Sequence, residues 1–431
     1  MKNRCCYLLL PMLWALLSLS AAHAEEPVLL GDPVLSGSAA AVEEVQLRGV
    51  VRDRQSRRRL PHVNIILEGT NIGTVSNADG VFELRVPASF RRLKFSHIGY
   101  ASSYLYPTEA DDDLTIWMVP VETILSDVIV YGADPRQVVL DALDRVDRNY
   151  PASEQLLSLF YRETVQKGRR YIGVSEAVME VLKGDYRQRD IAGDRVRLRK
   201  GRQLVSQRSR DTLSVKVAGG PTLAVVMDIA KNPDALLDPA YIDDYRFELE
   251  GSTEIDGRLQ YVIAFRPQRK ADYLLFSGLL YIDRERRAFT RAEFDLDLSD
   301  RDLAVRSILR KRPAGLRFQP QRVHFVVGYR QEEGVSMLHY LQSTIRAKCD
   351  WRKRLFSSVY TTQTEMVVVD REEAPAGTIS RKDAFRQHQI FSDLVSAYDD
   401  ADYWEGYNII PPTESLEHAV ERLKRAAEAG N

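Results

Sequence analysis

The sequence predicts a mainly β protein: a small β-sandwich followed by a large curved antiparallel sheet with flanking helices. Alternating apolar and polar residues recur in many short segments, which is the period of half-buried strands. Turn residues separate six such segments within the first third of the chain. The chain has 431 residues, enough for two or three domains.

The predicted large sheet is clearest between Asp243 and Leu298. The segments Tyr245–Glu250, Leu259–Phe265 and Ala292–Leu298 each place apolar side chains on one face and mostly polar ones on the other. A strand with one solvent-exposed face favours antiparallel pairing, because parallel sheets are normally buried on both faces.

The first hairpin of this sheet offers two registers. A two-residue Asp256-Gly257 loop is the stronger turn signal, but it would pair Glu250 with Ile263 on the apolar face. A three-residue loop, Ile255–Gly257, pairs Leu249 with Ile263 instead. Since a one-residue slip turns the whole apolar face over, we expect the three-residue loop, with its glycine left-handed.

A second hairpin is expected next, running out along Leu279–Asp283, turning at Arg284–Arg287 and returning along Ala288–Leu298. The antiparallel domain as a whole is expected to span residues 156–370. Further strands are expected at Leu157–Val165, Tyr171–Leu182, Arg195–Leu204, Leu303–Lys311, Arg317–Tyr329, Ser336–Lys348 and Val359–Val369, with a short helix in Pro221–Asp238.

The N-terminus has the form of a secretory signal peptide over residues 1–24. Lys2 and Arg4 precede an apolar run, and Ala22-His23-Ala24 is a small-x-small cleavage site. Cleavage would leave 407 of the 431 residues and, by removing two cations, change the formal net charge from −1 to −3. We therefore expect an exported protein, and no later run has the length of a membrane span.

Composition excludes several classes of function. Acidic and basic residues nearly cancel, so no basic field for nucleic acid is expected. Only Cys349 lies beyond the predicted cleavage site, which excludes an intramolecular disulfide and a cysteine-based metal site. The sequence does not show whether Cys349 is buried.

Residues 25–44 are small and acidic and are expected to form a disordered lead-in. Residues 45–120 are predicted to form the small β-sandwich. The expected strands are Leu47–Arg52, Val63–Leu67, Val81–Val86, Leu93–Ser96, Ser103–Tyr106 and Leu114–Met118. The first loop is basic, with Arg52, Arg54, Arg57, Arg58 and Arg59. We interpret it as a solvated loop, with anionic-surface binding as the alternative.

Leu47–Pro87, with its Gly-x-Val, Pro-x-x-Asn-Ile, Gly-Thr and Asp-Gly-x-Phe elements, and the following FSHIGY resemble the carboxypeptidase-regulatory-like domain. Leu125–Gly132 resembles the segment that follows this domain in TonB-linked outer-membrane receptors. The resemblance implies a transthyretin-like seven-stranded sandwich with an accessory role. It brings no catalytic residues, and no peptidase domain follows.

Residues 121–155 are expected to form a linker and a helix. Asp134 is a suitable N-cap, proline follows at the first helical position, and Tyr150-Pro151 ends the helix. Val138, Val139, Ala142, Leu143 and Val146 form its apolar stripe.

Residues 371–431 are expected to form a largely helical tail. Arg381–Tyr398 is predicted helical, and Thr413 is a candidate cap for a last helix ending near Ala427, with Leu416, Val420 and Leu423 as its apolar face. Between these helices, the segments Asp399–Trp404 and Tyr407–Pro412 are rich in aromatic, acidic and apolar residues. We expect them to dock the tail on the sheet.

The motif search identifies no catalytic, cofactor or metal residues. His418 and Glu421 match the His-x-x-Glu of a zinc site, but no third ligand follows them. Arg195, Arg197 and Arg199 share a strand face, which we expect to be solvated and opposite acids such as Asp295 and Asp297. The acidic stretches Asp111–Asp113 and Asp295–Asp302 lack the EF-hand pattern, and Asn77, Asp79 and Gly80 are expected to form a turn.

These patterns favour an exported cell-envelope protein, periplasmic or associated with the outer membrane, that acts as a non-enzymatic binding or accessory module. The partner would be a peptide, a glycan, a lipid or an outer-membrane protein. The large sheet resembles in architecture the half-barrels of LolA/LolB-type lipoprotein carriers. The alternative is a hydrolase whose site forms only in three dimensions, with several titratable groups of shifted pKa in one pocket.

Overall fold

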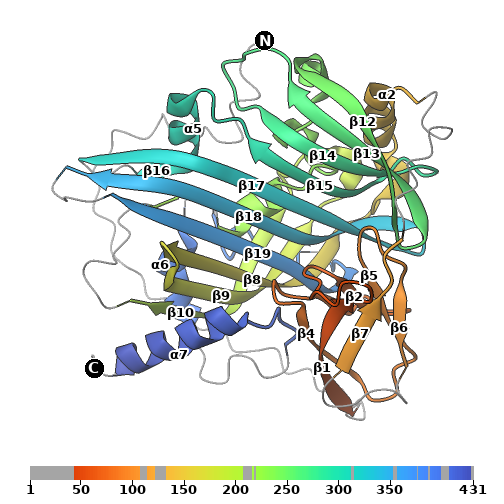
Figure 1. Cartoon of the computed structure of the whole chain (residues 1–431), viewed down its shortest axis with the longest axis horizontal. Helices are drawn as coiled ribbons and strands as arrows, with labels where there is room; N and C mark the ends of the chain where they lie inside the picture. Colours follow the sequence, from red (N-terminus) through yellow and green to blue (C-terminus); the bar gives the residue numbers. More distant parts are fainter. Residues whose placement is uncertain are drawn as a thin grey trace.

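The computed structural model describes residues 43–106, 114–121, 133–206, 216–217, 220–311, 315–352, 357–375, 377–386, 389–398 and 407–428. Two β structures pack against each other, a small domain built from β1–β7 and a large curved sheet built from ten later strands (Figure 1). The mainly β prediction is confirmed.

The small domain is a sandwich of a three-stranded sheet, β4-β1-β7, and a four-stranded sheet, β3-β2-β5-β6. Its strands are β1 (Glu44–Asp53), β2 (Asn64–Leu67), β3 (Gly73–Val75), β4 (Val81–Pro87), β5 (Leu93–Ser96), β6 (Ser103–Leu105) and β7 (Leu114–Met118). The three-residue strand β3 is too short to show a period in the sequence. A compact core fills the sandwich, with Phe82 and Phe95 in edge-to-face contact at 5.3 Å.

The large sheet is antiparallel throughout and has the order β10-β9-β8-β19-β18-β17-β15-β14-β13-β12. Its strands are β8 (Gln155–Lys167), β9 (Arg170–Lys183), β10 (Arg195–Val205), β12 (Tyr245–Ile255), β13 (Arg258–Pro267), β14 (Phe276–Asp283), β15 (Phe289–Leu296), β17 (Leu316–Glu332), β18 (Val335–Trp351) and β19 (Ser358–Glu373). The short strands β11 (Lys216–Val217) and β16 (Leu309–Lys311) pair separately.

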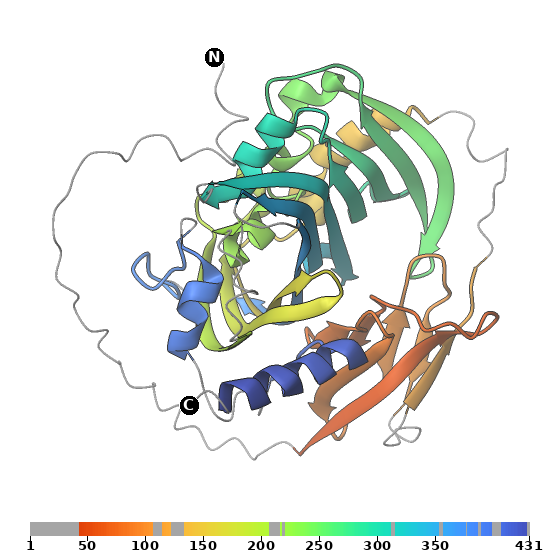
Figure 2. The same ribbon diagram turned by 60° about the vertical axis from the view of Figure 1, so that its left-hand side comes forward.

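The large sheet curls around segments of its own chain (Figure 2). These segments include α2 (Pro135–Asp144), α3 (Val146–Asn149), α4 (Pro221–Val226), α5 (Arg301–Ile308), α6 (Phe391–Leu394) and the 3₁₀ helices η3 (Tyr186–Gln188), η5 (Pro233–Ala235), η6 (Pro239–Asp244) and η7 (Val395–Tyr398). The outer side carries the small domain and the last helix, α7 (Glu414–Glu428).

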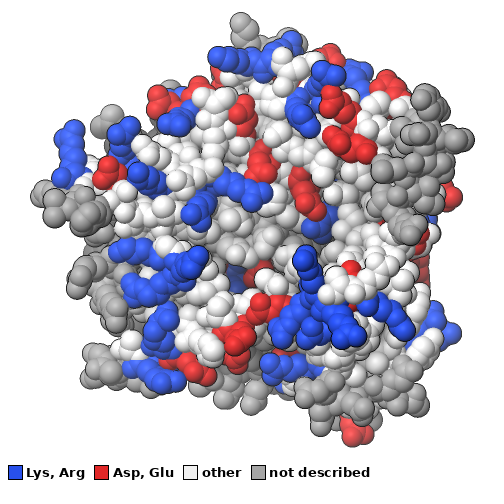
Figure 3. All heavy atoms as spheres, in the orientation of Figure 1, with Lys and Arg blue, Asp and Glu red and all other residues white. Residues whose placement is uncertain are grey.

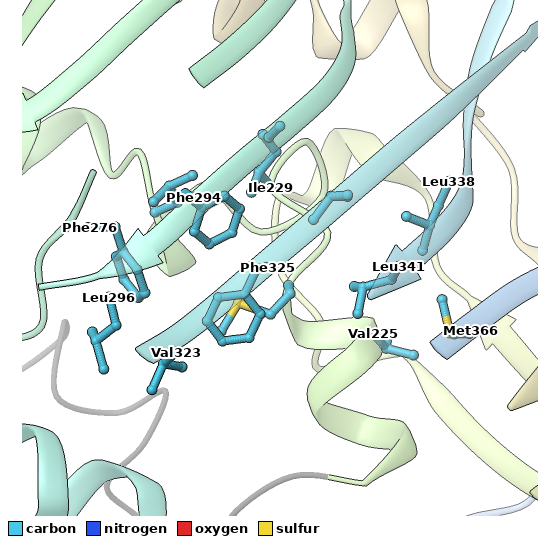
Figure 4. Packing of buried hydrophobic residues seen from close by; sticks show 14 of the residues in the cluster. Val225, Ile229, Phe276, Phe294, Leu296, Val323, Phe325, Leu338, Leu341 and Met366 are labelled. Atoms are coloured by element: carbon cyan, nitrogen blue, oxygen red, sulfur yellow. The ribbon is translucent and has the colours of Figure 1, made fainter. Parts of the chain in front are cut away.

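The inner face of the sheet forms the main hydrophobic core. Phe294 and Phe325 stack with ring centroids 5.3 Å apart, and Phe276 meets Phe294 edge-on at 5.5 Å (Figure 4). Val225 and the fully buried Ile229, from the segment inside the curve, pack into the same cluster. The chain itself therefore occupies this apolar face.

The predicted helix after Asp134 is confirmed, and so is its cap. The Asp134 carboxylate accepts a hydrogen bond from the Arg136 backbone N–H at 3.0 Å, and the helical stretch ends at Tyr150. All five residues of the expected apolar stripe are buried. The expected cap of the last helix is also present, because the Thr413 hydroxyl accepts from the Leu416 N–H at 3.3 Å.

The three-residue loop predicted for the first hairpin is wrong. Ile255 pairs with Arg258, which leaves a two-residue loop in which Asp256 and Gly257 both have positive φ, 54° and 73°. The predicted pairing of Leu249 with Ile263 nevertheless holds, because a β-bulge absorbs one residue between Leu249 and Gly251. The hairpin therefore has the two-residue turn that Asp-Gly favours and still keeps Leu249 and Ile263 on the apolar face.

Two other predictions need correction. Leu303–Lys311 was expected to be a strand, but its first part belongs to α5, because the Asp300 carboxylate caps that helix by accepting from the Leu303 N–H at 2.9 Å. Arg381–Tyr398 is helical only in α6 and η7. Residues 381–384 form turns instead, and the Phe385 N–H that follows them donates to the Val196 carbonyl of β10 at 2.7 Å.

Replacing Gly257 with alanine should destabilise the protein by about 1 kcal/mol, because a side chain resists positive φ. No atom lies within 4 Å of a Cβ built there, so the cost is conformational. Gly193 is the matched control, since it also has open space but no positive φ. Urea unfolding should show a loss for Gly257→Ala and none for Gly193→Ala; equal losses would contradict the assigned loop.

Candidate functional site

The residues that the sequence singled out do not assemble into one site. Arg197 and Arg199 bind Glu180 on the neighbouring strand, and the Arg195 guanidinium donates to the Ile379 carbonyl at 2.6 Å. The expected pairing of this stripe with Asp295 is wrong, because five strands separate β10 from β15. Asp295 instead binds Arg322 at 2.8 Å and His324 at 3.2 Å.

The other residues that the sequence singled out also lie apart from one another or outside the described residues. Cys349 is buried, and burial raises the pKa of its thiol to about 11. His418 and Glu421 lie on α7, and no three His, Cys, Asp or Glu side chains in the described part of the chain group closely enough to hold a metal ion. Asp111–Asp113 and Asp399–Trp404 lie outside the described residues.

A buried charged cluster lies inside the curve of the sheet, where sequence reasoning found none. The Lys183 ammonium contacts Asp194 and Asp228, at 2.9 Å each. Asp228 also accepts hydrogen bonds from the hydroxyls of Tyr186 at 2.7 Å and Tyr329 at 2.8 Å. Lys183 is 1% and Asp228 0% exposed, so solvent and substrate do not reach this cluster.

The electrostatics of the cluster favour a fixed ionic state. The two carboxylates outweigh the desolvation of Lys183 and raise the pKa of its ammonium. Burial and the charge of Asp228 raise the pKa values of Tyr186 and Tyr329 well above the ordinary value. None of these three groups is held near a pKa of 7, so we interpret the cluster as a structural support of β9.

Replacing Lys183 with methionine should cost about 3–5 kcal/mol of unfolding free energy, because two buried carboxylates lose their counter-ion. The control is Arg425→Met, which breaks an exposed pair with Glu421 on α7 and should change stability by less than about 0.5 kcal/mol. Equal urea midpoints for wild-type protein and Lys183→Met would contradict the structural role.

The C-terminal segment straps the small domain onto the outer face of the large sheet. The Asn77 amide donates to the carbonyls of Pro411 at 3.1 Å and Pro412 at 3.0 Å. The Arg162 guanidinium, 2% exposed, donates to the Ile410 carbonyl and to Glu176, at 2.7 Å each. The predicted docking of the tail is confirmed for residues 407–412, and the Asn77 turn is one of the elements that this segment contacts.

Three histidines lie where the small domain meets the sheet. Burial, together with Arg291, lowers the pKa values of His62 and His97 to about 4. Burial and the charge of Arg330 lower the pKa of His339 to about 3. The interface therefore holds all three rings in the neutral form at neutral pH.

Lowering the pH should weaken the fold through these histidines. Their pKa values are lower in the folded than in the unfolded state, so their stabilisation is complete above pH 6.5 and is lost as pH falls toward 4. For His339 alone the loss between pH 7 and pH 4 should be on the order of 3 kcal/mol. A His339→Gln variant should flatten the pH dependence of Tm, whereas His418→Gln should leave it unchanged.

A cleft of about 740 Å³ opens beside this interface. One wall comes from β2, β5 and the β2–β3 turn of the small domain; the other comes from the β17–β18 turn, the end of β19 and the segment before β8. The lining residues are Ile66, Glu68, Gly69, Thr70, Asn71, Lys94, Pro151, Ala152, Ser153, Gln155, Gln331, Glu332, Glu333, Val335 and Arg371. Its size lies within the range of about 300–1,000 Å³ typical of ligand sites.

Hydrogen bonds and an ion pair fix the two walls of the cleft to each other. The Asn71 amide donates to the Arg371 carbonyl at 2.7 Å, and the Arg371 guanidinium donates back to the Asn71 side chain at 3.0 Å. Lys94 forms an ion pair with Asp256, in the β12–β13 turn. The cleft is therefore preorganised rather than formed by loose loops.

Charged groups in the cleft are largely compensated within the protein. Glu68 pairs with Arg92, which lowers the pKa of the Glu68 carboxyl. Arg371 lies 3.8 Å from Glu332. Over the visible face of the molecule, acidic and basic side chains are likewise interspersed, with a group of cations over the small domain at lower right (Figure 3). The cleft thus offers hydrogen bonds and small apolar surfaces rather than a single-sign field.

No local pattern in the sequence indicates this cleft, because its residues come from distant segments, such as Asn71 and Arg371, which are 300 positions apart. Glu68 has a lowered pKa and is held by its arginine, so it is not poised as a general acid.

Residues 47–130 match the family model of the CarboxypepD_reg-like domain, which confirms the resemblance of the small domain. A segment of 99 residues is 28% identical to the TonB-dependent receptor P3 of Formosa agariphila and covers 23% of this chain. The match spans only 10% of the receptor's length.

Two solved structures give low-scoring matches. A LolA superfamily protein from Nitrosomonas europaea has a TM-score of 0.21 at 11% identity, covering 58% of this chain and 99% of its own. A DUF1329 family protein from Desulfovibrio piger has a TM-score of 0.25 at 12% identity, covering 57% of this chain and 96% of its own.

Proposed function

We propose that this protein is an exported cell-envelope binding protein. It holds its ligand in the cleft between the small domain and the large sheet and catalyses no reaction on it. The observation that carries the proposal is the cleft itself: about 740 Å³, walled by two separately folded β structures and braced by the reciprocal Asn71–Arg371 contacts. A preformed cleft at a domain junction that offers both apolar and polar groups is a common ligand site.

The envelope location draws on two observations. The N-terminal sequence has the pattern of a secretory signal, and the small domain is homologous to a segment of a TonB-dependent receptor. In the described part of the chain, no helix is long and apolar enough to cross a bilayer. We propose a periplasmic or outer-membrane-associated protein whose partner is a peptide, a glycan, a lipid or an outer-membrane protein.

The chemistry of the cleft ranks these partners. A lipid chain requires a continuous apolar lining, whereas ten of the fifteen residues that line this cleft carry amide, hydroxyl or charged side chains. The apolar inner face of the large sheet suits a lipid chemically, but Val225, Ile229 and their neighbours are packed against it. The arrangement therefore favours a polar partner over a lipid cargo.

The test places a photo-crosslinking amino acid, p-benzoylphenylalanine, at Ala152 in the cleft and, as a control, at the exposed Glu421 on α7. The protein is irradiated in native envelopes, and the adducts are identified by mass spectrometry. We expect one dominant adduct at Ala152 and none of the same mass at Glu421. Equal labelling at both positions, or none at Ala152, would refute the assignment; a hydrolysed product at Ala152 would favour the hydrolase alternative.

A further inference from the structure

Two rows of side chains cross the outer face of the small domain and lead out of the cleft. In the first row, Ile66 lies opposite Lys94, and Lys94 lies opposite Tyr104. Residues paired in this way across antiparallel strands share a face and contact one another. Since Ile66 and Lys94 line the cleft, the row starts inside it and ends at Tyr104 on β6.

The second row runs beside the first and consists of Glu68, Arg92 and Tyr106. Glu68 lines the cleft and forms an ion pair with Arg92. Hydrogen bonds to Glu68 and to Tyr106 raise the pKa of Arg92. The Arg92 guanidinium also lies 4.6 Å from the centroid of the Tyr104 ring. Arg92 thus connects an acidic residue of the cleft with both tyrosines.

The two tyrosines are unusually exposed for their size. Tyr104 is 42% and Tyr106 44% exposed, and β6 is the last strand of its sheet. We call Tyr104, Tyr106 and Arg92 the tyrosine ledge. Tyrosine and arginine are the residue types enriched at the energetic centres of protein interfaces, because they supply large rigid contact area together with hydrogen bonds. Contacts to Arg92 hold the ledge in place before any partner binds.

We propose that the cleft and the tyrosine ledge form one continuous docking surface for an extended polypeptide segment of a partner protein. The inference rests on the proposed function of the cleft and names its class of partner. The cleft is lined both by apolar side chains, such as Ile66 and Val335, and by amides such as Gln331, so an extended chain would find partners there for its apolar side chains and for its backbone amides. Compensated ion pairs leave no single-sign field that would require a highly charged ligand.

The test selects peptides on the mature protein from a phage-displayed random dodecapeptide library and measures synthetic copies by isothermal titration calorimetry. The variant is Tyr104→Ser/Tyr106→Ser, which removes the rings of the ledge without touching the cleft. Tyr398→Ser is the matched control, because Tyr398 is also 42% exposed but lies on η7. We expect the double variant to weaken binding at least ten-fold and the control to leave the Kd unchanged, with native circular dichroism in both.

The outcomes separate this inference from the proposed function. Peptides that bind the double variant as tightly as the wild-type protein would overturn the role of the ledge. A library that yields no binder, while the crosslinker at Ala152 captures a glycan or a lipid, would overturn the polypeptide partner and leave the cleft as a binding site. Absence of any adduct at Ala152 would instead remove the proposed function.

Discussion

The docking of the small domain against the outer face of the large sheet is the contact on which the rest of the structure depends. Val75 of β3 packs there with Phe160, Tyr340 and Ile410 in one buried cluster. The polar part of the same contact is the Arg162–Glu176 pair, whose arginine also holds the Ile410 carbonyl. A buried charge pair tolerates little displacement, so it fixes the tail and the domain in one position.

This docking explains why part of the large sheet is buried on both faces although the sheet is antiparallel. The inner face is covered by helices and 3₁₀ turns of the same domain, and the outer face by the small domain and α7. Strand β9 shows the result, because eight consecutive residues, Ile172–Met179, are buried. Such strands lack the solvent-exposed face that the alternating pattern of other strands in the sheet predicts.

The cleft lies beside the contact between the small domain and the large sheet. Residues of both structures line it, including those of the β17–β18 turn. The walls are held by Asn71, Arg371 and Lys94, whose hydrogen bonds and ion pairs cross from one domain to the other. The buried Lys183 cluster, by contrast, is sealed and supports the sheet from within.

The sequence alone determined what depends on local periodicity and on short-range capping. It predicted antiparallel strands, six of the seven strands of the small domain, the Asp134 and Thr413 caps and the apolar stripes of α2 and α7, since each is encoded within about ten residues. The Leu249–Ile263 pairing was predicted because the apolar face required it, but the bulge that permits a two-residue loop has no separate signature.

Only the tertiary structure decided where these elements meet. The Lys183 cluster joins β9 to Asp194 and Asp228, and the cleft joins Asn71 to Arg371, so neither is visible in any local window. Tyr104 of β6 and Tyr106, just after it, have an ordinary strand pattern in the sequence. They are exposed because they lie on the outer face of the small domain, at the last strand of its sheet. Long-range burial and charge pairing, which local propensity does not encode, therefore set the candidate site.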